Sequence, residues 1–214
     1  MHKMLSKVYA AVFFACADDG IGKFDRSMLC QQDLMELFIF GLNELEKICG
    51  SLDDPDDVCE WKGVKCNGDG EVEVFEWNNE QQAGTLGFEF LPCSIKIVEM
   101  YFNVLSGTIQ LADLPGKMEE LLLDGNQLTG SLDLDGLPAT VRELSLSSNE
   151  FTREISLEKL PKCLEHLDLA ENQLSADPTK GHLSVVGWTS TPVLGEAKNL
   201  FKPLVVFLSW RRPY

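Results

Sequence analysis

Basic residues are scarce in this 214-residue sequence, which contains 18 Lys and Arg against 34 Asp and Glu. The formal net charge is therefore -16 at pH 7. Because phosphate recognition depends on clustered Lys and Arg, this balance argues against a nucleic-acid-binding protein. The composition is not that of a disordered chain, since 44% of the residues are hydrophobic and 24% are charged. These values are typical of a globular domain.

Long apolar runs and catalytic motifs are also missing. No run approaches the roughly 20 residues that a membrane-spanning helix needs, so we expect no such helix. The sequence contains no glycine-rich phosphate-binding loop, no Gly-x-Ser-x-Gly motif and no His-Glu-x-x-His motif. Cys163 and His166 could suggest a thiol–imidazole pair, but no third group is evident that would orient it. The sequence therefore predicts a protein that is not an enzyme, with neither a cofactor nor a metal site.

The first 17 residues are typical of a secretory signal peptide. Lys3 and Lys7 precede an apolar stretch over residues 8–17, which ends in Ala-Cys-Ala before two aspartates. The alternative is a buried N-terminal helix of a cytosolic protein. In the signal-peptide interpretation the protein is secreted or associated with the cell surface, and an even number of cysteines remains, which permits disulfides. The sequence has no Asn-x-Ser/Thr site, so N-glycosylation gives no support to secretion.

A 23-residue period runs through the middle of the chain. Four asparagines recur at this spacing: Asn103, Asn126, Asn149 and Asn172. The apolar residues around them keep the same register, as in MEELLLDGNQLTGSLDLDGLPAT and VRELSLSSNEFTREISLEKLPKC. The pattern continues upstream, where Glu80 replaces the asparagine and Gln82 replaces an apolar residue. Such internal repetition is typical of a solenoid, in which stacked units share one core.

These units resemble the leucine-rich-repeat family in both spacing and residue type. The resemblance implies an α/β fold, a short solenoid of about five units of 23 residues with a helical, disulfide-containing N-terminal cap. Each Leu-x-Leu would form a short strand with alternating side chains, and each repeated asparagine would turn the chain by hydrogen bonding to the backbone. We therefore interpret the four asparagines as structural. Gly84, Gly107 and Gly130 are expected where the chain bends closely.

The cap is predicted from a cysteine motif directly before the repeats. Cys59-x-Trp61-x-Gly63-Val64-x-Cys66 resembles the N-terminal cap that precedes plant-type leucine-rich repeats in receptor-like ectodomains and secreted inhibitors. This resemblance implies a disulfide between Cys59 and Cys66. A reduced pair or half of a zinc site is the alternative, and zinc is disfavoured because no second Cys or His pair stands at ligand spacing.

A single cap helix is expected upstream of that motif. Six apolar residues lie at helical spacing: Leu34, Leu37, Phe38, Leu42, Leu45 and Ile48. Ser27 is a candidate N-cap and Gly50 a candidate stop. Cys30 and Cys49 are a candidate second disulfide. Cys93 and Cys163 lie about three repeat steps apart, roughly 14 Å at strand spacing, which is too far for a disulfide.

Four regions are predicted along the chain. Residues 1–17 are the signal peptide, 18–71 the N-terminal cap, 72–178 the repeats and 179–214 an irregular C-terminal segment. This last segment is basic, with five Lys and Arg against one Glu. It could be a C-terminal cap, a membrane-surface segment or the truncated end of a longer protein.

The repeat register also predicts which side chains line the concave sheet. Three outward positions per unit are Val74, Glu76, Asn78, Ile97, Glu99, Tyr101, Glu120, Leu122, Asp124, Glu143, Ser145, Ser147, His166, Asp168 and Ala170. Six of these are acidic, none is Lys or Arg, and Ile97, Tyr101 and Leu122 form a small apolar cluster with Phe102 beside them. The candidate ligand-binding residues are Glu76, Asn78, Glu99, Tyr101, Phe102, Glu120, Leu122, Asp124, Glu143, Ser145, His166 and Asp168. The alternative is that the carboxylates only keep an exposed sheet soluble.

An aromatic and apolar cluster among charged residues suits protein or peptide recognition. We therefore predict a non-catalytic recognition module that binds a protein or peptide on its concave face. A partner with basic residues is favoured by electrostatic attraction. The alternatives are a secreted enzyme inhibitor on the same scaffold and a truncated receptor-like ectodomain.

Overall fold

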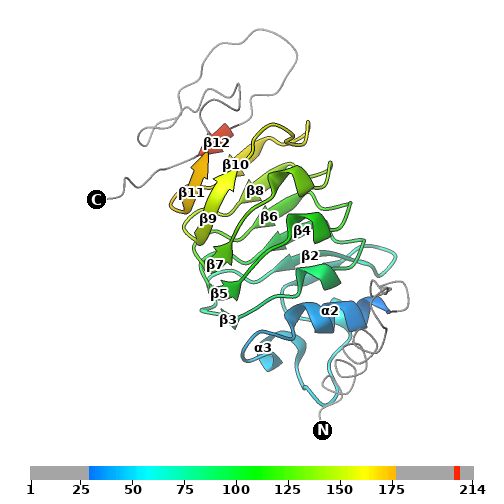
Figure 1. Ribbon diagram of the computed structural model, residues 1–214. Helices are drawn as coiled ribbons and strands as arrows, with labels where there is room; N and C mark the ends of the chain where they lie inside the picture. Colours follow the sequence, from blue (N-terminus) through cyan, green and yellow to red (C-terminus); the bar gives the residue numbers. More distant parts are fainter. Residues whose placement is uncertain (1–28, 177–204, 208–214) are drawn as a thin grey trace, which may run out of the picture.

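The computed structural model describes residues 29–176 and the strand at 205–207 (Figure 1). The predicted signal peptide, the candidate N-cap Ser27 and nearly all of the predicted C-terminal segment lie outside the described residues. Within the described residues, no helix is both long and apolar enough to cross a membrane.

A seven-stranded sheet forms one side of the stack. Its strands, in spatial order, are β1 (Val64–Cys66), β2 (Val72–Glu76), β4 (Ile97–Glu99), β6 (Glu120–Leu122), β8 (Glu143–Ser145), β10 (His166–Asp168) and β12 (Val205–Phe207). β1 pairs antiparallel to β2, and the remaining pairs are parallel. Ile97 pairs with Glu120 and Glu120 with Glu143, so the strands advance by 23 residues as the repeat predicts. The predicted solenoid is confirmed.

A second, five-stranded sheet runs beside the first and was not predicted from the sequence. It consists of β3 (Ala83–Gly84), β5 (Val104–Gly107), β7 (Gln127–Gly130), β9 (Glu150–Ile155) and β11 (Gln173–Ala176). Short 3-10 helices occupy the return segments: η3 (Phe88–Phe90), η4 (Leu111–Asp113) and η5 (Leu134–Gly136). α-Helices therefore occur in the cap, while the described coils are built of strands and 3-10 turns.

The repeated asparagines hydrogen-bond to the backbone as predicted, and the structure shows in addition that they are buried and join neighbouring coils. Asn126 Oδ1 accepts a hydrogen bond from Leu105 N (3.0 Å), in the preceding coil. Its Nδ2 donates to the carbonyl oxygens of Met100 (2.9 Å) and Leu123 (3.0 Å). Asn103, Asn149 and Asn172 make the corresponding bonds in their own coils. One side chain thus satisfies backbone groups that the turning chain would otherwise leave unpaired.

The predicted glycine bend is confirmed as a left-handed backbone position. Gly84, Gly107 and Gly130 have φ values of 120°, 97° and 96°. In the next coil the same position is occupied by Arg153, with φ 76°. Glycine adopts this conformation without a Cβ clash, whereas arginine is strained in it.

The single cap helix predicted over residues 27–50 is wrong. The segment forms α2 (Gln31–Ile39) and α3 (Glu46–Cys49), with an extended break between them. Cys30 rather than Ser27 precedes α2 and provides no side-chain cap, while Gly50 does end the second helix.

The break occurs because the chain pairs with the edge of the second sheet instead of continuing as a helix. Thr85 N donates to Gly41 O, and Asn43 N donates to Ala83 O, both at 2.9 Å. A Cβ on Gly41 would lie 2.3 Å from Thr85 Oγ1, so glycine is needed for this close approach.

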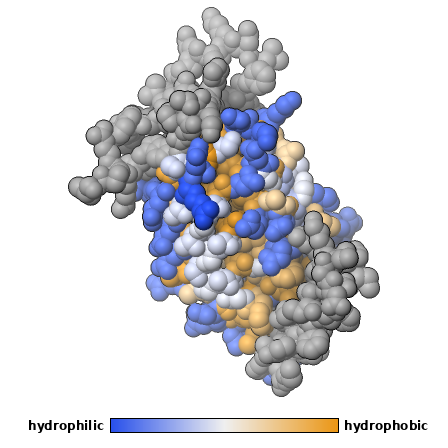
Figure 2. All heavy atoms as spheres, viewed as in Figure 1, coloured by the Kyte–Doolittle hydropathy of each residue, from blue (hydrophilic) through white to orange (hydrophobic). Residues whose placement is uncertain are grey.

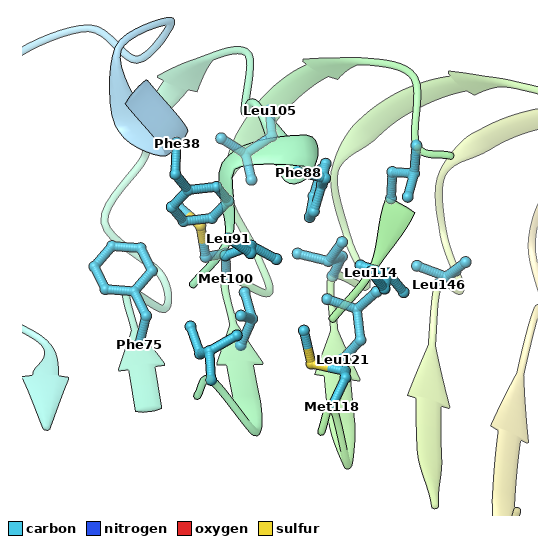
Figure 3. Packing of buried hydrophobic residues seen from close by; sticks show 14 of the residues in the cluster. Phe38, Phe75, Phe88, Leu91, Met100, Leu105, Leu114, Met118, Leu121 and Leu146 are labelled. Carbon is cyan, nitrogen blue, oxygen red and sulfur yellow. The ribbon is translucent and has the colours of Figure 1, made fainter. Parts of the chain in front are cut away.

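Aromatic packing joins the cap to the repeats in one core. Phe38 of α2 meets Phe75 and Phe88 edge-on, with ring centroids 5.8 and 5.9 Å apart (Figure 3). Leucine and methionine side chains continue this core along the stack, including Met100 and Leu121, which are fully buried. Burial of this apolar surface is the main favourable contribution to stability.

Hydrogen bonds explain why Gln82 occupies an apolar position of the first repeat unit. Its side chain is 4% exposed, although a polar amide occupies an apolar slot there. Trp77 Nε1 donates to Gln82 Oε1 (3.3 Å), and Gln82 Nε2 donates to the carbonyl oxygen of Asn43 in the cap. The amide is therefore satisfied on both sides at the junction between cap and repeats.

The disulfide between Cys59 and Cys66 is confirmed. The candidate pairing of Cys30 with Cys49 is wrong, because both thiols are free. Cys30 is exposed beside Asp33, whereas Cys49 is buried and donates to Leu45 O, so the two face different surroundings. Burial raises the pKa of the Cys49 thiol to about 11.

Candidate functional site

The predicted outward positions form three columns along the seven-stranded sheet. Register pairs place Val74, Ile97, Glu120, Glu143 and His166 in the first column, and Glu76, Glu99, Leu122, Ser145 and Asp168 in the second. Asn78, Tyr101, Asp124, Ser147 and Ala170 follow the strands as the third column. The intervening side chains of β4, β6 and β10 are buried, so the columns lie on the opposite face. The candidate binding residues of these columns therefore share one surface, on which Ser145 is buried and the others are half-buried, while Phe102 follows Tyr101 at the end of the third column.

Several carboxylates on this surface have defined partners within the protein. Glu76 pairs with Lys65 Nζ at 2.6 Å, close to the cap. Asn78 Nδ2 donates to Glu99 Oε2 at 3.0 Å, one coil further along. Asp168 Oδ1 accepts a hydrogen bond from the backbone nitrogen of Ala170 (3.0 Å). These bonds fix the orientation of the carboxylates.

The middle of the surface is acidic in two successive strands. Glu120 and Glu143 are direct register partners on β6 and β8. Burial raises the pKa of Glu120, and the neighbouring charges of Glu143 and Glu99 raise it further. Asp124 behaves similarly, since burial and Asp168 raise its pKa although its hydrogen bonds lower it. The charged forms of these carboxylates are thus disfavoured by their surroundings.

A column of alternating charge borders the acidic surface. Its members are 23 residues apart: Glu73, Lys96, Glu119, Arg142 and Glu165. Lys96 Nζ lies 2.6 Å from Glu73 Oε1, and Arg142 Nη2 lies 3.0 Å from Glu165 Oε1. These hydrogen bonds raise the pKa of both cations, and the charge of Glu119 between them adds to the effect. The border largely neutralises itself, so it leaves the acidity of the adjacent columns in place. This alternation was not predicted from the sequence, although the 23-residue spacing of Lys96, Glu119 and Arg142 could have indicated it.

Phe102 is the more exposed of two large apolar residues that lie open to solvent within residues 29–176. In the described part of the chain, the exposed large hydrophobic residues are Phe102, at 59%, and Val104, at 38%. The rings of Tyr101 and Phe102 meet edge-on, with centroids 5.7 Å apart. In Figure 2, hydrophobic residues appear along the stack between hydrophilic margins.

The backbone at Phe102 is left-handed, with φ 53°. The same position recurs in every coil, at Asn79, Phe102, Gly125, Ser148 and Glu171, always with positive φ. A bulky residue in this conformation is a genuine outlier, with strain on the order of 1–3 kcal/mol. Phe102 was predicted as a candidate binding residue beside the apolar cluster, but its left-handed backbone was not predicted from the sequence. Aligning this position across the repeats would have singled it out, because the other coils have glycine or a polar residue there.

Among residues 29–176, no group of three or more His, Cys, Asp or Glu side chains is placed to hold a metal ion. The Cys163 thiol donates to the backbone oxygens of Ala139 (2.7 Å) and Val141 (3.3 Å) in the preceding coil.

No protein-family model and no curated protein matches the sequence. Solved structures, in contrast, are similar to this chain. The chain is similar to the BIR3–SERK2 complex from Arabidopsis thaliana, with 24% identity and a TM-score of 0.56 over 66% of this chain and 81% of that one. It is similar to the leucine-rich-repeat ectodomain of the receptor kinase SOBIR1 from Arabidopsis thaliana, with 23% identity and a TM-score of 0.50 over 61% and 77%.

A third similar structure is the Arabidopsis receptor kinase HAESA in complex with the peptide hormone IDA and the co-receptor SERK1. The identity is 21% and the TM-score 0.54, and the match covers 68% of this chain but 30% of that one. These likenesses concern the fold. The chain therefore has the fold of a leucine-rich-repeat solenoid, with a disulfide in its N-terminal cap.

Proposed function

We propose that this protein is a non-catalytic recognition module that binds a protein or peptide with basic residues on its concave sheet. The observation that carries the proposal is the charge of that surface. Six of its fifteen outward positions are Glu or Asp and none is Lys or Arg. Glu120 and Asp124 have raised pKa values, because burial and nearby acids disfavour their charged forms. A cationic partner would relieve this repulsion and would be drawn to the surface from solution.

The rigidity of the surface supports the same function. The asparagine ladder fixes each coil against the next, and hydrogen bonds from Asn78 and Ser145 hold the carboxylates of Glu99 and Asp124. A surface that is ordered before binding loses little conformational entropy when a partner arrives. The fold likeness supports recognition in general, since HAESA is in complex with a peptide hormone and BIR3 with SERK2.

A secreted or cell-surface location belongs to the same proposal. The first 17 residues are typical of a signal peptide, and a disulfide persists in oxidising compartments. When eukaryotic cells express the full-length chain, we expect it to appear in the medium with residues 1–17 removed. Retention of the intact chain in the cytosol would contradict it.

The binding experiment uses the full chain as bait for a phage-displayed library of random 12-residue peptides. Selected peptides are then synthesised with a fluorescent label and titrated by anisotropy. We expect the peptides to be rich in Lys and Arg, and their Kd to rise about tenfold between 50 and 500 mM NaCl.

The double variant Glu120→Gln/Glu143→Gln should weaken this binding. Its matched control is Glu150→Gln/Glu158→Gln, which removes the same charge outside the concave columns and should leave binding unchanged. Peptides without basic residues, or equal binding by both double variants, would contradict the proposal. An inhibitor of a secreted enzyme would use the same surface, and the concave variant would then restore its target's activity.

A further inference from the structure

We infer that Tyr101, Phe102 and Asp124 form the anchor of the recognition surface. Its occupant is an extended segment of a partner protein in which Lys or Arg stands two residues from a bulky apolar residue, so that both side chains point to the same side. This inference rests on the proposed function and specifies where the partner's contact is centred. We call these three residues the anchor.

Exposure of Phe102 is the first observation. Its side chain is 59% exposed, whereas the equivalent positions of the other coils hold Asn79, Gly125, Ser148 and Glu171. The strained backbone makes phenylalanine a poor choice for stability at this position. An exposed aromatic ring that gains nothing from the core is typical of a residue retained for contact with a partner.

The second observation is that the ring is held in place although it is exposed. A Cβ on Gly125 would lie 2.5 Å from Phe102 Cδ1, so the ring rests directly on the glycine of the next coil. Tyr101 supports it edge-on at 5.7 Å. A fixed aromatic surface loses little side-chain entropy on binding, which is the property of an interface hot spot.

The third observation is that the Asp124 carboxylate lies beside the Phe102 ring, which favours a partner segment with a basic residue. Phe102 N donates to Asp124 O at 2.8 Å, so the ring and the carboxylate belong to hydrogen-bonded neighbours. Ser145 Oγ donates to Asp124 Oδ1 at 3.3 Å and orients the carboxylate. The cations at the border of the sheet, Lys96 and Arg142, are engaged by Glu73 and Glu165.

Spacing fits an extended peptide. Neighbouring coils are about 4.8 Å apart, and an extended chain rises about 3.3 Å per residue. Successive side chains of an extended chain point to opposite sides, so those two residues apart, about 6.6 Å, can reach Phe102 and Asp124 together. The apolar side chain would cover the two rings, and the basic side chain would meet the carboxylate, with a guanidinium also able to stack on an aromatic face.

The test uses the labelled peptides selected above and the variant Phe102→Asn. Asparagine occupies the equivalent position at Asn79, so it is compatible with the left-handed backbone. We expect the selected peptides to share a basic residue two positions from an apolar one, and Phe102→Asn to weaken their binding at least tenfold. Its melting temperature should be unchanged or higher, because strain is removed.

Two further variants distinguish a role of the Phe102 ring in binding from an effect on folding. Ser148→Asn places the same residue at the same position two coils away and should bind like the wild type. Phe102→Tyr keeps an aromatic ring and should retain binding within about threefold. A fall in the melting temperature of Phe102→Asn comparable to that of a core mutation, with Phe102→Tyr normal, would show a structural role and overturn the inference.

The outcomes also distinguish this inference from the proposed function. If Glu120→Gln/Glu143→Gln weakens binding and Phe102→Asn does not, the anchor is wrong and the acidic recognition surface stands. If Phe102→Asn weakens binding and the charge variant does not, the anchor stands and the electrostatic part of the proposed function is wrong. Self-association of the wild type in sedimentation, abolished in Phe102→Asn, would identify a second copy as the occupant and overturn the partner assigned here.

Discussion

The asparagine ladder predicts that two chemically identical substitutions have unequal effects. Asn103 and Asn126 are each 8% exposed, so Asn→Ala removes the same atoms at the same burial. Their hydrogen-bond partners differ, because Asn103 is the first asparagine of the ladder, whereas Asn126 has another ladder asparagine on each side.

In Asn126→Ala, the carbonyl oxygen of Met100 keeps its bond from Asn103, and that of Leu123 keeps its bond from Asn149. Only the Leu105 N–H loses the partner that the ladder provides. One unsatisfied buried N–H costs about 1–3 kcal/mol, and we expect a loss of about 2 kcal/mol in unfolding free energy.

Asn103→Ala leaves more backbone groups without a partner than Asn126→Ala does. Asn103 Oδ1 accepts from both Glu80 N (3.1 Å) and Gln82 N (2.9 Å). Its Nδ2 donates to Trp77 O (2.7 Å), which no other ladder asparagine contacts. With three groups affected, one of them at the exposed residue Glu80, we expect a loss of about 3–4 kcal/mol.

Equilibrium unfolding in urea, followed by the fluorescence of the buried Trp61 and Trp77, measures both losses. The slope of the free energy against urea should match the wild type in each variant, since a change would indicate that the coils no longer unfold together. Equal losses, or a greater loss in Asn126→Ala, would refute the assignment of shared carbonyl acceptors.

Three other predictions concern single positions. Arg153→Gly should raise the unfolding free energy in urea by about 0.5–1 kcal/mol, because glycine adopts φ 76° without strain; a loss would show that the arginine side chain contributes more than the strain removes. Gly84→Ala should lower the melting temperature sharply, since its Cβ would lie 2.2 Å from the backbone oxygen of Gly41, whereas Gly116→Ala, with no atom within 4 Å, should not. Glu120→Gln should raise the unfolding free energy at pH 7. The folded pKa of Glu120 lies above its unfolded value, so ionisation at high pH destabilises the fold, and this gain should vanish below the ordinary pKa of 4.5. Chemical unfolding at pH 7 and pH 3.5 measures the difference, and an equal gain at both values would contradict the charge argument.

The repeat period made the concave sheet predictable from the sequence. Because residues 23 apart occupy equivalent places, one correctly aligned unit fixes the strands, the asparagines and the outward columns of all the others. Whether those columns bind a partner is a separate question, which the proposed experiments address.

Features outside the period were harder to predict. Leu42, Leu45 and Ile48 continue the helical spacing of α2 and are buried, yet a turn and a second helix bring them into the core. Apolar periodicity cannot distinguish these arrangements, and Gly41 was the available signal for the break. The second sheet was not predicted from the sequence, because strands such as β3, with two residues, are too short to show an alternating pattern.

The alternating column beside the concave sheet has a consequence for the length of the solenoid. Removing the coil that carries Glu119 would bring Lys96 against Arg142, and like charges on adjacent strands are destabilising. Removing two successive coils, with Lys96 and Glu119, would bring Glu73 against Arg142 and restore attraction. Duplicating a single coil would likewise place like charges on adjacent strands, whereas duplicating two successive coils would keep the charges alternating. The border therefore favours gain or loss of coils in pairs, so that relatives of different length should differ by an even number of repeats wherever this column is kept.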